Sequence, residues 1–416
     1  MKFKCNKGML AEAVASAQKA VSLKSTLPIL EGLLLTVGDG LTLTGNDLEI
    51  AIQCEIPVQV IERGSVVMNC RLFSEMVRKL PDDIVTMSLS EENVIKVECG
   101  NARFEVKGLP AAGYPELPSV GRSNALRIGQ ATLREMIRRT RFAISVNDNR
   151  PILTGALFAK EDGEFTVVAI DGIRLALRKE TLKAGCGDEA GDRAGDGQGS
   201  GEGPGAGDGG GIVGPDLDGG PDVTVIGADG EELARADGDF SLVIPGKSLN
   251  ELEKLLTGDD EVTLYSSKNQ ALFDMGGCKV ITRLLQGEYL KYRSMVTRES
   301  QTSIRFKVMD LLGVIDRISL IAMDDKFVPI CLDIKDDAIH VTSQTVQGSA
   351  AEEIAVEMRG NPLKVSYYPR YVMEVLRNIG DDEVTMNFNS NMGPSCIFPL
   401  EGDAYAYVVM PCSTRS

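Results

Sequence analysis

The stretch Arg71–Leu89, RLFSEMVRKLPDDIVTMSL, contains the pattern that decides the fold. Apolar residues recur at helical spacing as far as Leu80, a Pro-Asp-Asp turn follows, and Ile84–Leu89 alternates as a half-buried strand does. The same succession returns twice, with helices expected at Lys247–Leu256 and Pro369–Ile379 and strands expected at Val262–Tyr265 and Val384–Phe388. A succession that recurs at a fixed period indicates one structural unit used several times.

Each copy also begins alike, with an amphipathic helix followed by two short strands around a tight turn. The opening helices are expected at Lys7–Ala20, Gln130–Ile144 and Met309–Ile321. Equivalent helices start ~120 residues apart once a Gly- and Asp-rich insert, residues 184–239, is subtracted from the middle copy. The sequence therefore predicts an α+β protein of three tandem units, residues 1–121, 122–292 and 293–416, each with two helices packed on antiparallel sheets.

The insert differs from the rest of the chain in composition. Glycine alternates with Asp and Glu, and so little apolar surface cannot offset the entropy of ordering the chain. Calcium-binding nonapeptide repeats are disfavoured because the aliphatic residue of each turn is missing, and a phosphate-binding loop is disfavoured because no strand-then-helix frame surrounds it. The interpretation is a flexible acidic loop in the middle unit.

Composition excludes several classes of protein. No apolar run in the 416 residues approaches the ~18–20 residues of a membrane span, and the N-terminus is charged, unlike a signal peptide. The nine cysteines include no C-x-x-C pair, which disfavours zinc sites and disulfide frameworks and fits a cytoplasmic protein. With His340 as the single histidine, His-based catalysis and metal binding are disfavoured, so we expect no cofactor and no metal.

Repeated units with open sheet edges can join edge to edge and either close into a ring or polymerise. The six expected helices are basic as a group, although the net charge of the chain is −16. Basic helices in an acidic protein are typical of a surface that faces phosphate, although Lys and Arg are also simply good helix formers. One hypothesis is therefore a ring whose basic helices face the phosphates of DNA. The rival hypothesis is a repeat scaffold that binds proteins through its sheet edges and never encircles DNA.

Two patterns resemble enzyme motifs and do not complete them. Gly246-Lys247-Ser248 matches the end of a P-loop, but Ser241 stands where the first glycine is required. Asn46, Asp47 and Glu49 could hold a cation, but at the end of an alternating strand they are more simply a solvated turn. We therefore expect no catalytic activity.

Several runs resemble the bacterial DNA polymerase III beta subunit family of DNA sliding clamps. They occur in the family's order: Met1-Lys2-Phe3, Thr26-Leu27-Pro28-Ile29-Leu30, Leu43-Thr44-Gly45-Asn46-Asp47-Leu48-Glu49, Asp171-Gly172-Ile173-Arg174-Leu175-Ala176 and Ala406-Tyr407-Val408-Val409-Met410-Pro411. The resemblance covers essentially the whole chain outside the insert. The resemblance implies three clamp domains per chain and a head-to-tail homodimer around duplex DNA. It also implies a non-catalytic processivity factor that an ATP-dependent clamp loader opens onto DNA in the cytoplasm, at the nucleoid.

The resemblance also assigns residues to sites. DNA contact, independent of base sequence, is implied for Lys24, Arg71, Asn147 and Asp148, with Arg78 and Arg138 as further candidates on inward helices. A dimer contact is implied for Phe104 and Ile321. A pocket for the polymerase III alpha subunit and for other proteins of replication and repair is implied for Arg150, Leu153, Ile170, Gly172, Ile173, Arg174, Leu175, Pro245, Leu249, Val408, Val409, Met410 and Pro411.

In that pocket the apolar side chains would form a groove, with Arg150 and Arg174 orienting the bound peptide. The alternative is that these apolar residues only fill the core between domains. Two departures leave the peptide preference open: Ile173 stands where several family members have histidine, and the chain continues past Pro411 to Ser416. For the insert, the hypothesis is that it projects outward and repels DNA from the outer face.

Overall fold

A computed structural model describes residues 1–22, 24–121, 125–147, 149–182, 225–226, 232–233, 239–322 and 328–412. The first unit contains β1 (Lys2–Asn6), α1 (Lys7–Ala17), β2 (Gly32–Val37), β3 (Leu41–Asn46), β4 (Ile50–Ile56), β5 (Gln59–Glu62), β6 (Gly64–Asn69), α2 (Cys70–Lys79), β7 (Ile84–Leu89), β8 (Val94–Cys99) and β9 (Ala102–Lys107).

The second and third units repeat this order of elements. The second contains β10 (Leu126–Gly129), α3 (Gln130–Thr140), β11 (Gly155–Glu161), β12 (Glu164–Ile170), β13 (Arg174–Thr181), β14 (Val225–Ile226), β15 (Glu232–Leu233), β16 (Phe240–Pro245), α4 (Gly246–Glu253), β17 (Glu261–Ser266), β18 (Gln270–Asp274) and β19 (Cys278–Arg283). The third contains β20 (Thr302–Lys307), α5 (Val308–Ser319), β21 (Ile330–Lys335), β22 (Ala338–Thr345), β23 (Gly348–Ala355), β24 (Glu357–Gly360), β25 (Leu363–Tyr367), α6 (Pro369–Arg377), β26 (Glu383–Phe388), β27 (Ser395–Pro399) and β28 (Tyr405–Val409).

The repeat predicted from the sequence is confirmed, because the predicted helices and strands agree with the observed ones to within a few residues. Each opening helix ends in a short 3₁₀ turn, which accounts for the slightly longer helices predicted. The insert follows β13, at the position that β5 occupies in the first unit and β24 occupies in the third. Apart from the small hairpin β14–β15 and Asp239, residues 184–239 lie outside the described residues.

Helix α2 shows how the local sequence positions the elements. Asn69 caps the helix by accepting a hydrogen bond from the backbone N–H of Leu72. Phe73, Met76 and Val77 are buried on one face, so the opposite face is free to carry charge. Pro81 follows the helix closely, and β7 begins at the predicted residue.

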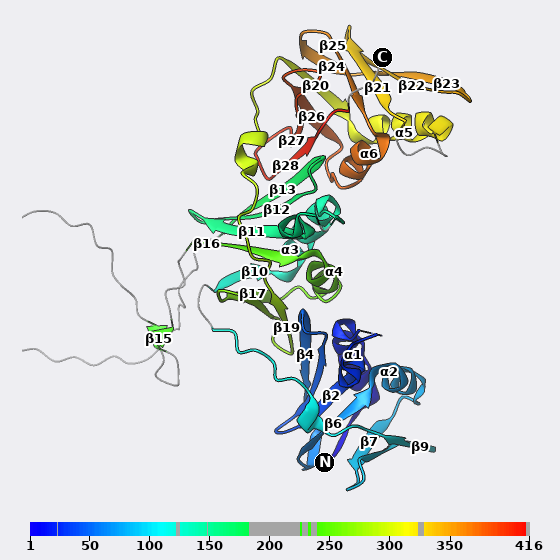
Figure 1. Ribbon diagram of the computed structural model, residues 1–416, viewed down its shortest axis with the longest axis vertical. Helices are drawn as coiled ribbons and strands as arrows, with labels where there is room; N and C mark the ends of the chain where they lie inside the picture. The colour runs from blue at the N-terminus through cyan, green and yellow to red at the C-terminus, as the bar shows by residue number, and fades with distance from the viewer. Residues whose placement is uncertain are drawn as a thin grey trace, which may run out of the picture.

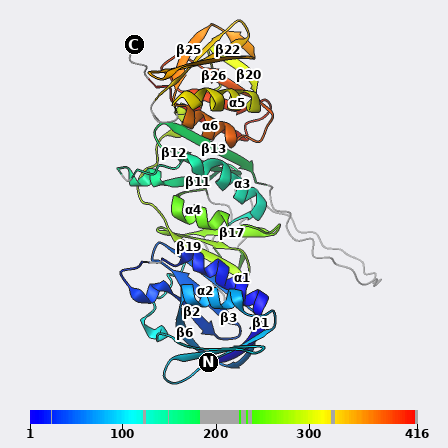
Figure 2. The ribbon, with the colours of Figure 1, turned by 90° about the vertical axis from the view of Figure 1, so that its right-hand side faces the viewer.

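The helices and sheets form layers around a large hydrophobic core. The chain curves as an arc, and the six α-helices of the described residues lie along its inner side while the sheets form the outer side (Figure 1). Figure 2 looks at that inner side and shows the helices of all three units following one another along the long axis. None of the helices that the structure describes has both the length and the apolar character that crossing a bilayer requires.

A second, smaller core covers the outer face of the second unit and its junction with the third. It contains Ile170, Leu175 and Val408, and Tyr289 and Val296 of the segment that connects the two units pack over it. Strands alternate their side chains between faces, so neighbours in one strand, such as Val408 and Val409, belong to different cores.

Candidate functional site

The inner side of the arc carries exposed cations at the positions predicted for DNA contact. Arg71 in the first turn of α2 and Lys24 in the loop after α1 are exposed, and no ion pair to either is found among the described residues. Arg78 and Arg138 are also exposed, and each lies near a helix carboxylate: Arg78 Nη2 is 2.5 Å from Glu75, and Arg138 Nη1 is 4.0 Å from Glu135. Asn147 is exposed, and Asp148 lies outside the described residues.

Several basic residues of the helices hold neighbouring units together instead of facing solvent, which their spacing in the sequence does not reveal. Lys247 of α4 binds Asp47 at 2.7 Å and Glu49 at 2.9 Å, so these carboxylates link the first unit to the second. Arg139 of α3 donates to the carbonyl of Asn378 in the third unit at 2.8 Å, and Lys19 donates to the carbonyl of Lys254 at 3.2 Å. The charge available on the inner surface is therefore smaller than the helix composition suggests.

Two strand pairs join the units into continuous sheets. We call the pairing of β4 with β19 seam 1 and the pairing of β13 with β28 seam 2. Seam 1 makes an eight-stranded sheet from the first and second units, and seam 2 makes a nine-stranded sheet from the second and third. In each seam, the third strand after the opening helix of one unit (β4 or β13) pairs with the last strand of the next unit (β19 or β28).

Both seams have the same register. In seam 1, Cys54, the fifth residue of β4, lies opposite Cys278, the first residue of β19. In seam 2, Arg178, the fifth residue of β13, lies opposite Tyr405, the first residue of β28. The backbone hydrogen bonds beside these pairs agree as well. Glu55 N donates to the carbonyl of Gly277 in seam 1, and Lys179 N donates to the carbonyl of Ala404 in seam 2, both at 2.8 Å. The strand pairing that joins the units is therefore repeated along the chain, as the units are.

The two strands that would form a third such joint lie at opposite ends of the arc. β9 is the edge of the five-stranded sheet in the first unit, and β23 is the edge of the four-stranded sheet in the third (Figure 1). Phe104 on β9 is 41% exposed. Ile321 is half-buried beside β23, where a Cβ placed on Gly348 would lie 3.3 Å from the Ile321 Cδ1 atom. The two residues predicted for the dimer contact therefore lie at the two free edges.

Arg174 bridges the second and third units by pairing with a carboxylate of each. It is 7% exposed, its Nε lies 3.0 Å from Asp171 Oδ2, and its two Nη groups donate to Glu374 and, at 2.6 Å, to the carbonyl of Phe142. Its guanidinium also lies 5.1 Å from the ring centroids of Phe142 and of Tyr371. The sequence predicted that Arg174 orients a bound peptide; in this structure its donors are committed to the protein itself.

The contacts with Arg174 and Arg370 lower the pKa of Glu374. Burial acts to raise the pKa of its carboxyl, but hydrogen bonds and charge from Arg174 and Arg370 outweigh burial and hold the pKa below its ordinary value. Glu374 was not among the predicted residues, because it is 200 residues from Arg174 and no local pattern connects them.

The residues predicted for the partner pocket are spread across the nine-stranded sheet, from Pro245 at the end of β16 to Val408 of β28 in seam 2. The backbone N–H of Met410 donates to the carbonyl of Ile173 at 2.8 Å, and Pro245 lies opposite Gly155 at the end of β16. Six of the apolar members are buried: Leu153, Ile170, Leu175, Leu249, Val408 and Val409.

One part of that prediction needs correction. Leu175 and Val408 belong to the outer core, whereas Leu249 belongs to the core on the helix side, so the three do not form one apolar groove in this conformation. The strand alternation that separates them was visible in the sequence, but the side of the sheet that α4 covers was not. The accessible part of the region is its rim, which consists of Arg150, Gly172, Ile173, Pro245, Met410 and Pro411.

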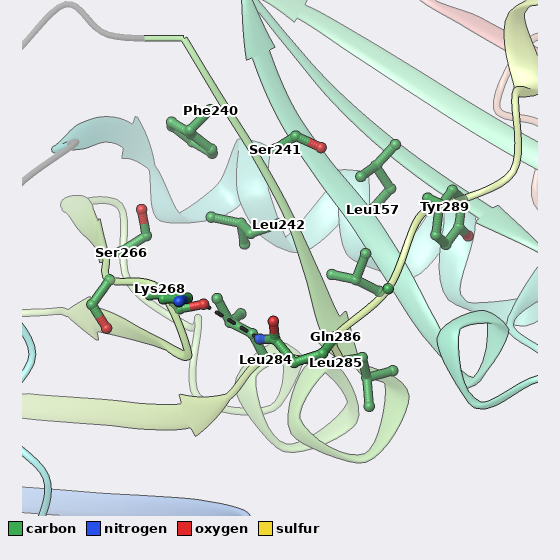
Figure 3. A pocket seen from close by; sticks show the side chains of 13 residues that line it. Leu157, Phe240, Ser241, Leu242, Ser266, Lys268, Leu284, Leu285, Gln286 and Tyr289 are labelled. Atoms are coloured by element: carbon green, nitrogen blue, oxygen red, sulfur yellow. Dashed lines mark hydrogen bonds between the residues drawn. The ribbon is translucent and has the colours of Figure 1, made fainter.

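A cavity of about 310 Å³ lies on the same outer face (Figure 3). It is bounded by β16 and the segment that leads from β19 toward Tyr289, and Gln286 closes part of it by donating to the carbonyl of Lys268 at 3.3 Å. None of the predicted pocket residues lines this cavity. It is a neighbour of the predicted site and not the site itself.

Comparison with known families matches nearly the whole chain outside the insert. Residues 1–118 match the N-terminal domain of the DNA polymerase III beta subunit, residues 127–191 and 231–291 match its central domain, and residues 293–413 match its C-terminal domain.

Individual relatives match over their full length. The "Beta sliding clamp" of Bacillus subtilis is 30% identical and that of Halalkalibacterium halodurans 28% identical, each with 100% of both chains covered. Among solved structures, the DNA polymerase sliding clamp from Bacillus subtilis has a TM-score of 0.84 at 30% identity, covering 100% of this chain and 99% of that chain. The DNA polymerase III beta chain from Streptococcus pneumoniae has a TM-score of 0.83 at 25% identity, covering 99% and 100%.

Proposed function

Because this chain belongs to the DNA polymerase III beta subunit family, the non-catalytic DNA sliding clamps, we propose that two copies join head to tail into a ring around duplex DNA. β9 of each copy pairs with β23 of the other, and the helices line the hole. The clamp then holds the replicative polymerase on DNA by topology, with no need for tight binding. The units are those proposed from the sequence, residues 1–121, 122–292 and 293–416.

The observation that carries this proposal is the repetition of the seams. If the third joint has the register of seams 1 and 2, the fifth residue of β23 faces the first residue of β9, which places Glu352 opposite Ala102. Phe104 then lies opposite Ala350, beside Ile321 and Gly348. A large exposed aromatic ring would thus meet small residues and an aliphatic side chain, which is the complementarity an apolar joint requires.

Contact with DNA rests on exposed side chains of helices α2 and α3 and of the loops that follow α1 and α3. Lys24, Arg71, Arg78, Arg138 and Asn147 present flexible or polar side chains that can reach phosphates, and Asp148 belongs to the same proposed set. Phosphate contacts hold no sequence information, so the ring can slide. The rest of the protein is acidic, which disfavours binding of DNA to the outer face.

Partner proteins would dock at the rim around seam 2. The polymerase III alpha subunit, the ATP-dependent clamp loader and other clamp-binding proteins of replication and repair are the proposed partners. Arg150, Gly172, Ile173, Pro245, Met410 and Pro411 are accessible, and a flexible methionine suits a surface that receives several peptides. The buried members of the proposed site, including Arg174 and Leu175, would support this rim from below. The proposed place of work is the cytoplasm, at the nucleoid.

Topological retention tests the proposed function. The protein is loaded onto nicked circular DNA with the clamp loader of the same cells, half of the sample is linearised, and both halves are gel-filtered. Retention on circles with loss from linear DNA is the expected result, because a ring slides off an end. Equal retention on both would favour the rival scaffold that binds DNA or proteins without encircling DNA.

Charge reversal on the inner helices should weaken contact with DNA. For Arg71→Glu with Arg138→Glu, we expect weaker binding to linear duplex DNA and a slope of log K against log salt that is smaller by about one for each lost phosphate contact. Lys291→Glu reverses the charge of an exposed residue in the outer segment between the second and third units and serves as the control. Titrations at several salt concentrations measure both. An equal loss in the control would show that the effect is one of net charge alone.

A charged residue at the rim of the partner site should reduce partner binding. Met410 is 38% exposed at the end of seam 2, so Met410→Lys places an ammonium group where an apolar peptide side chain would pack. We expect at least a ~10-fold loss of affinity for the polymerase III alpha subunit, consistent with loss of one apolar anchor. Met392→Lys, at an exposed methionine in the turn between β26 and β27, is the matched control. Unchanged affinity in Met410→Lys would show that the partner binds at another site.

A further inference from the structure

Cys54 and Cys278 are directly opposite each other in seam 1, one from the first unit and one from the second. Antiparallel strands alternate between hydrogen-bonded and non-hydrogen-bonded pairs. Glu55 N donates to Gly277 O at 2.8 Å and Arg283 N donates to Glu49 O at 2.9 Å, which makes these the bonded pairs. The cysteines lie between them in a non-hydrogen-bonded pair, where the two side chains project close together on the same face.

This position suits a covalent bond between the sulfurs. The Cα atoms of a non-hydrogen-bonded pair lie about 4.5 Å apart. A disulfide spans Cα separations of roughly 4.4–6.8 Å. The two side chains also pack in the same hydrophobic core, to which Cys54 belongs and against which Cys278 lies. Little movement of the backbone would be needed to bring them to bonding distance.

We propose that Cys54 and Cys278 form an oxidation site for hydroperoxides, at which a disulfide joins the first unit to the second. The pair lines a cavity of about 350 Å³ together with Met275, Glu12 and Ser16, so a small oxidant has access. Cys278 is half-buried, whereas Cys54 is 3% exposed, so Cys278 is the sulfur that the oxidant meets.

The surroundings divide the roles of the two thiols. The hydrogen bond with Cys54, assisted by the ammonium group of Lys19, lowers the pKa of Cys278, although burial opposes this. The same hydrogen bond and burial raise the pKa of Cys54, which stays protonated. Cys278 is therefore the nucleophile and Cys54 the resolving thiol.

The chemistry balances with one hydroperoxide. The Cys278 thiolate attacks the terminal oxygen, the O–O bond breaks, and a sulfenic acid forms while an alkoxide or hydroxide leaves. The Cys54 sulfur then attacks the Cys278 sulfur, the S–O bond breaks, and the oxygen leaves as water with the proton of the Cys54 thiol. Two thiols are oxidised to one disulfide, and the peroxide is reduced to water and an alcohol, or to water alone.

The equivalent position in seam 2 shows that the pair is specific to seam 1. There the guanidinium of Arg178 lies 5.9 Å from the ring centroid of Tyr405, which cannot form a covalent bond. Oxidation would therefore fix one joint within the chain and leave seam 2 unchanged. Amide hydrogen exchange in β4 and β19 should slow in the oxidised protein.

The test treats the full chain with hydrogen peroxide and maps its peptides without reduction. We expect a cross-linked peptide that joins Cys54 to Cys278 with the loss of two hydrogen atoms, and its release by dithiothreitol. Cys278→Ser should abolish it, and Cys331→Ser, at a half-buried cysteine of β21, should not. In a second variant, Cys54→Ala, Cys278 should stop at a sulfenic acid that dimedone traps.

Three results would overturn the proposal. Both cysteines could remain open to alkylation after peroxide treatment of the folded protein. Cys278 could proceed to a sulfinic acid while Cys54 stays reduced. The cross-link could persist in Cys278→Ser or vanish in Cys331→Ser, which would assign the disulfide to other thiols.

Discussion

Cysteines introduced at Ala102 and Glu352 of the same chain should convert the protein, on mild oxidation, into a covalent dimer of twice the chain mass. These positions are equivalent to Cys54 and Cys278 of seam 1, since Ala102 is the first residue of β9 and Glu352 is the fifth of β23. If the third joint repeats the first, the new pair has the geometry of the native one. A ring sealed at both joints should also be almost completely unable to load onto closed circular DNA.

The control for this prediction shifts the pair by one residue. Arg103→Cys with Glu352→Cys places the two sulfurs on opposite faces of the sheet, because successive residues of a strand alternate. Non-reducing gels and solution mass measure both variants under reduced and oxidised conditions. Efficient dimer formation by the shifted pair, or a monomeric mass for both reduced variants, would contradict the proposed joint. Glu352→Cys also removes an ion pair to Arg317, but both groups are exposed to solvent, so the pair adds little to stability.

Replacing Arg174 by alanine should destabilise the protein by about 3–5 kcal/mol, because two carboxylates lose a shared and largely buried partner. Asp171 and Glu374 come from the second and third units, so the loss falls on the contact that holds these units together. The carbonyl of Phe142 would lose its donor as well. Urea unfolding at neutral pH measures the change, and we expect a lower midpoint or separate unfolding of the third unit.

The pH dependence provides an independent readout of the same network. The pKa of Glu374 is lowered in the folded protein, so its contribution to stability is present above the unfolded carboxyl pKa, about 4.3, and is lost as pH falls through the lower folded value. Arg174→Ala should reduce this contribution, because only Arg370 then remains beside Glu374, so the variant should lose less stability on acidification than the parent. Arg78→Ala, at an exposed pair with Glu75, is the control and should change stability by about 1 kcal/mol at most. A similar loss of stability in both variants would show that the Arg174 network contributes no more to stability than an exposed ion pair does.

The sequence alone was sufficient for the architecture of each unit. The helix at Arg71, the acidic turn after it and the strand at Ile84 are all set by contacts within a few residues, so their periodicity is visible in the chain. The threefold repeat followed from the same local signals. The exposed positions of Arg71 and Arg138 also follow from helical spacing, since the buried faces of α2 and α3 are apolar in sequence.

The tertiary structure decided how the units meet, and this is where the sequence-based picture changed. Lys247 looked like part of a basic helix surface, but it binds Asp47 of another unit. Arg174 looked like a residue of a peptide pocket, but it is buried against Glu374, 200 residues away. Periodicity reports which face of an element is buried, but it does not report what covers that face. Pairing between strands far apart in the chain depends on the folded shape of both units, and only that shape showed that seams 1 and 2 share one register and leave β9 and β23 as the matching ends.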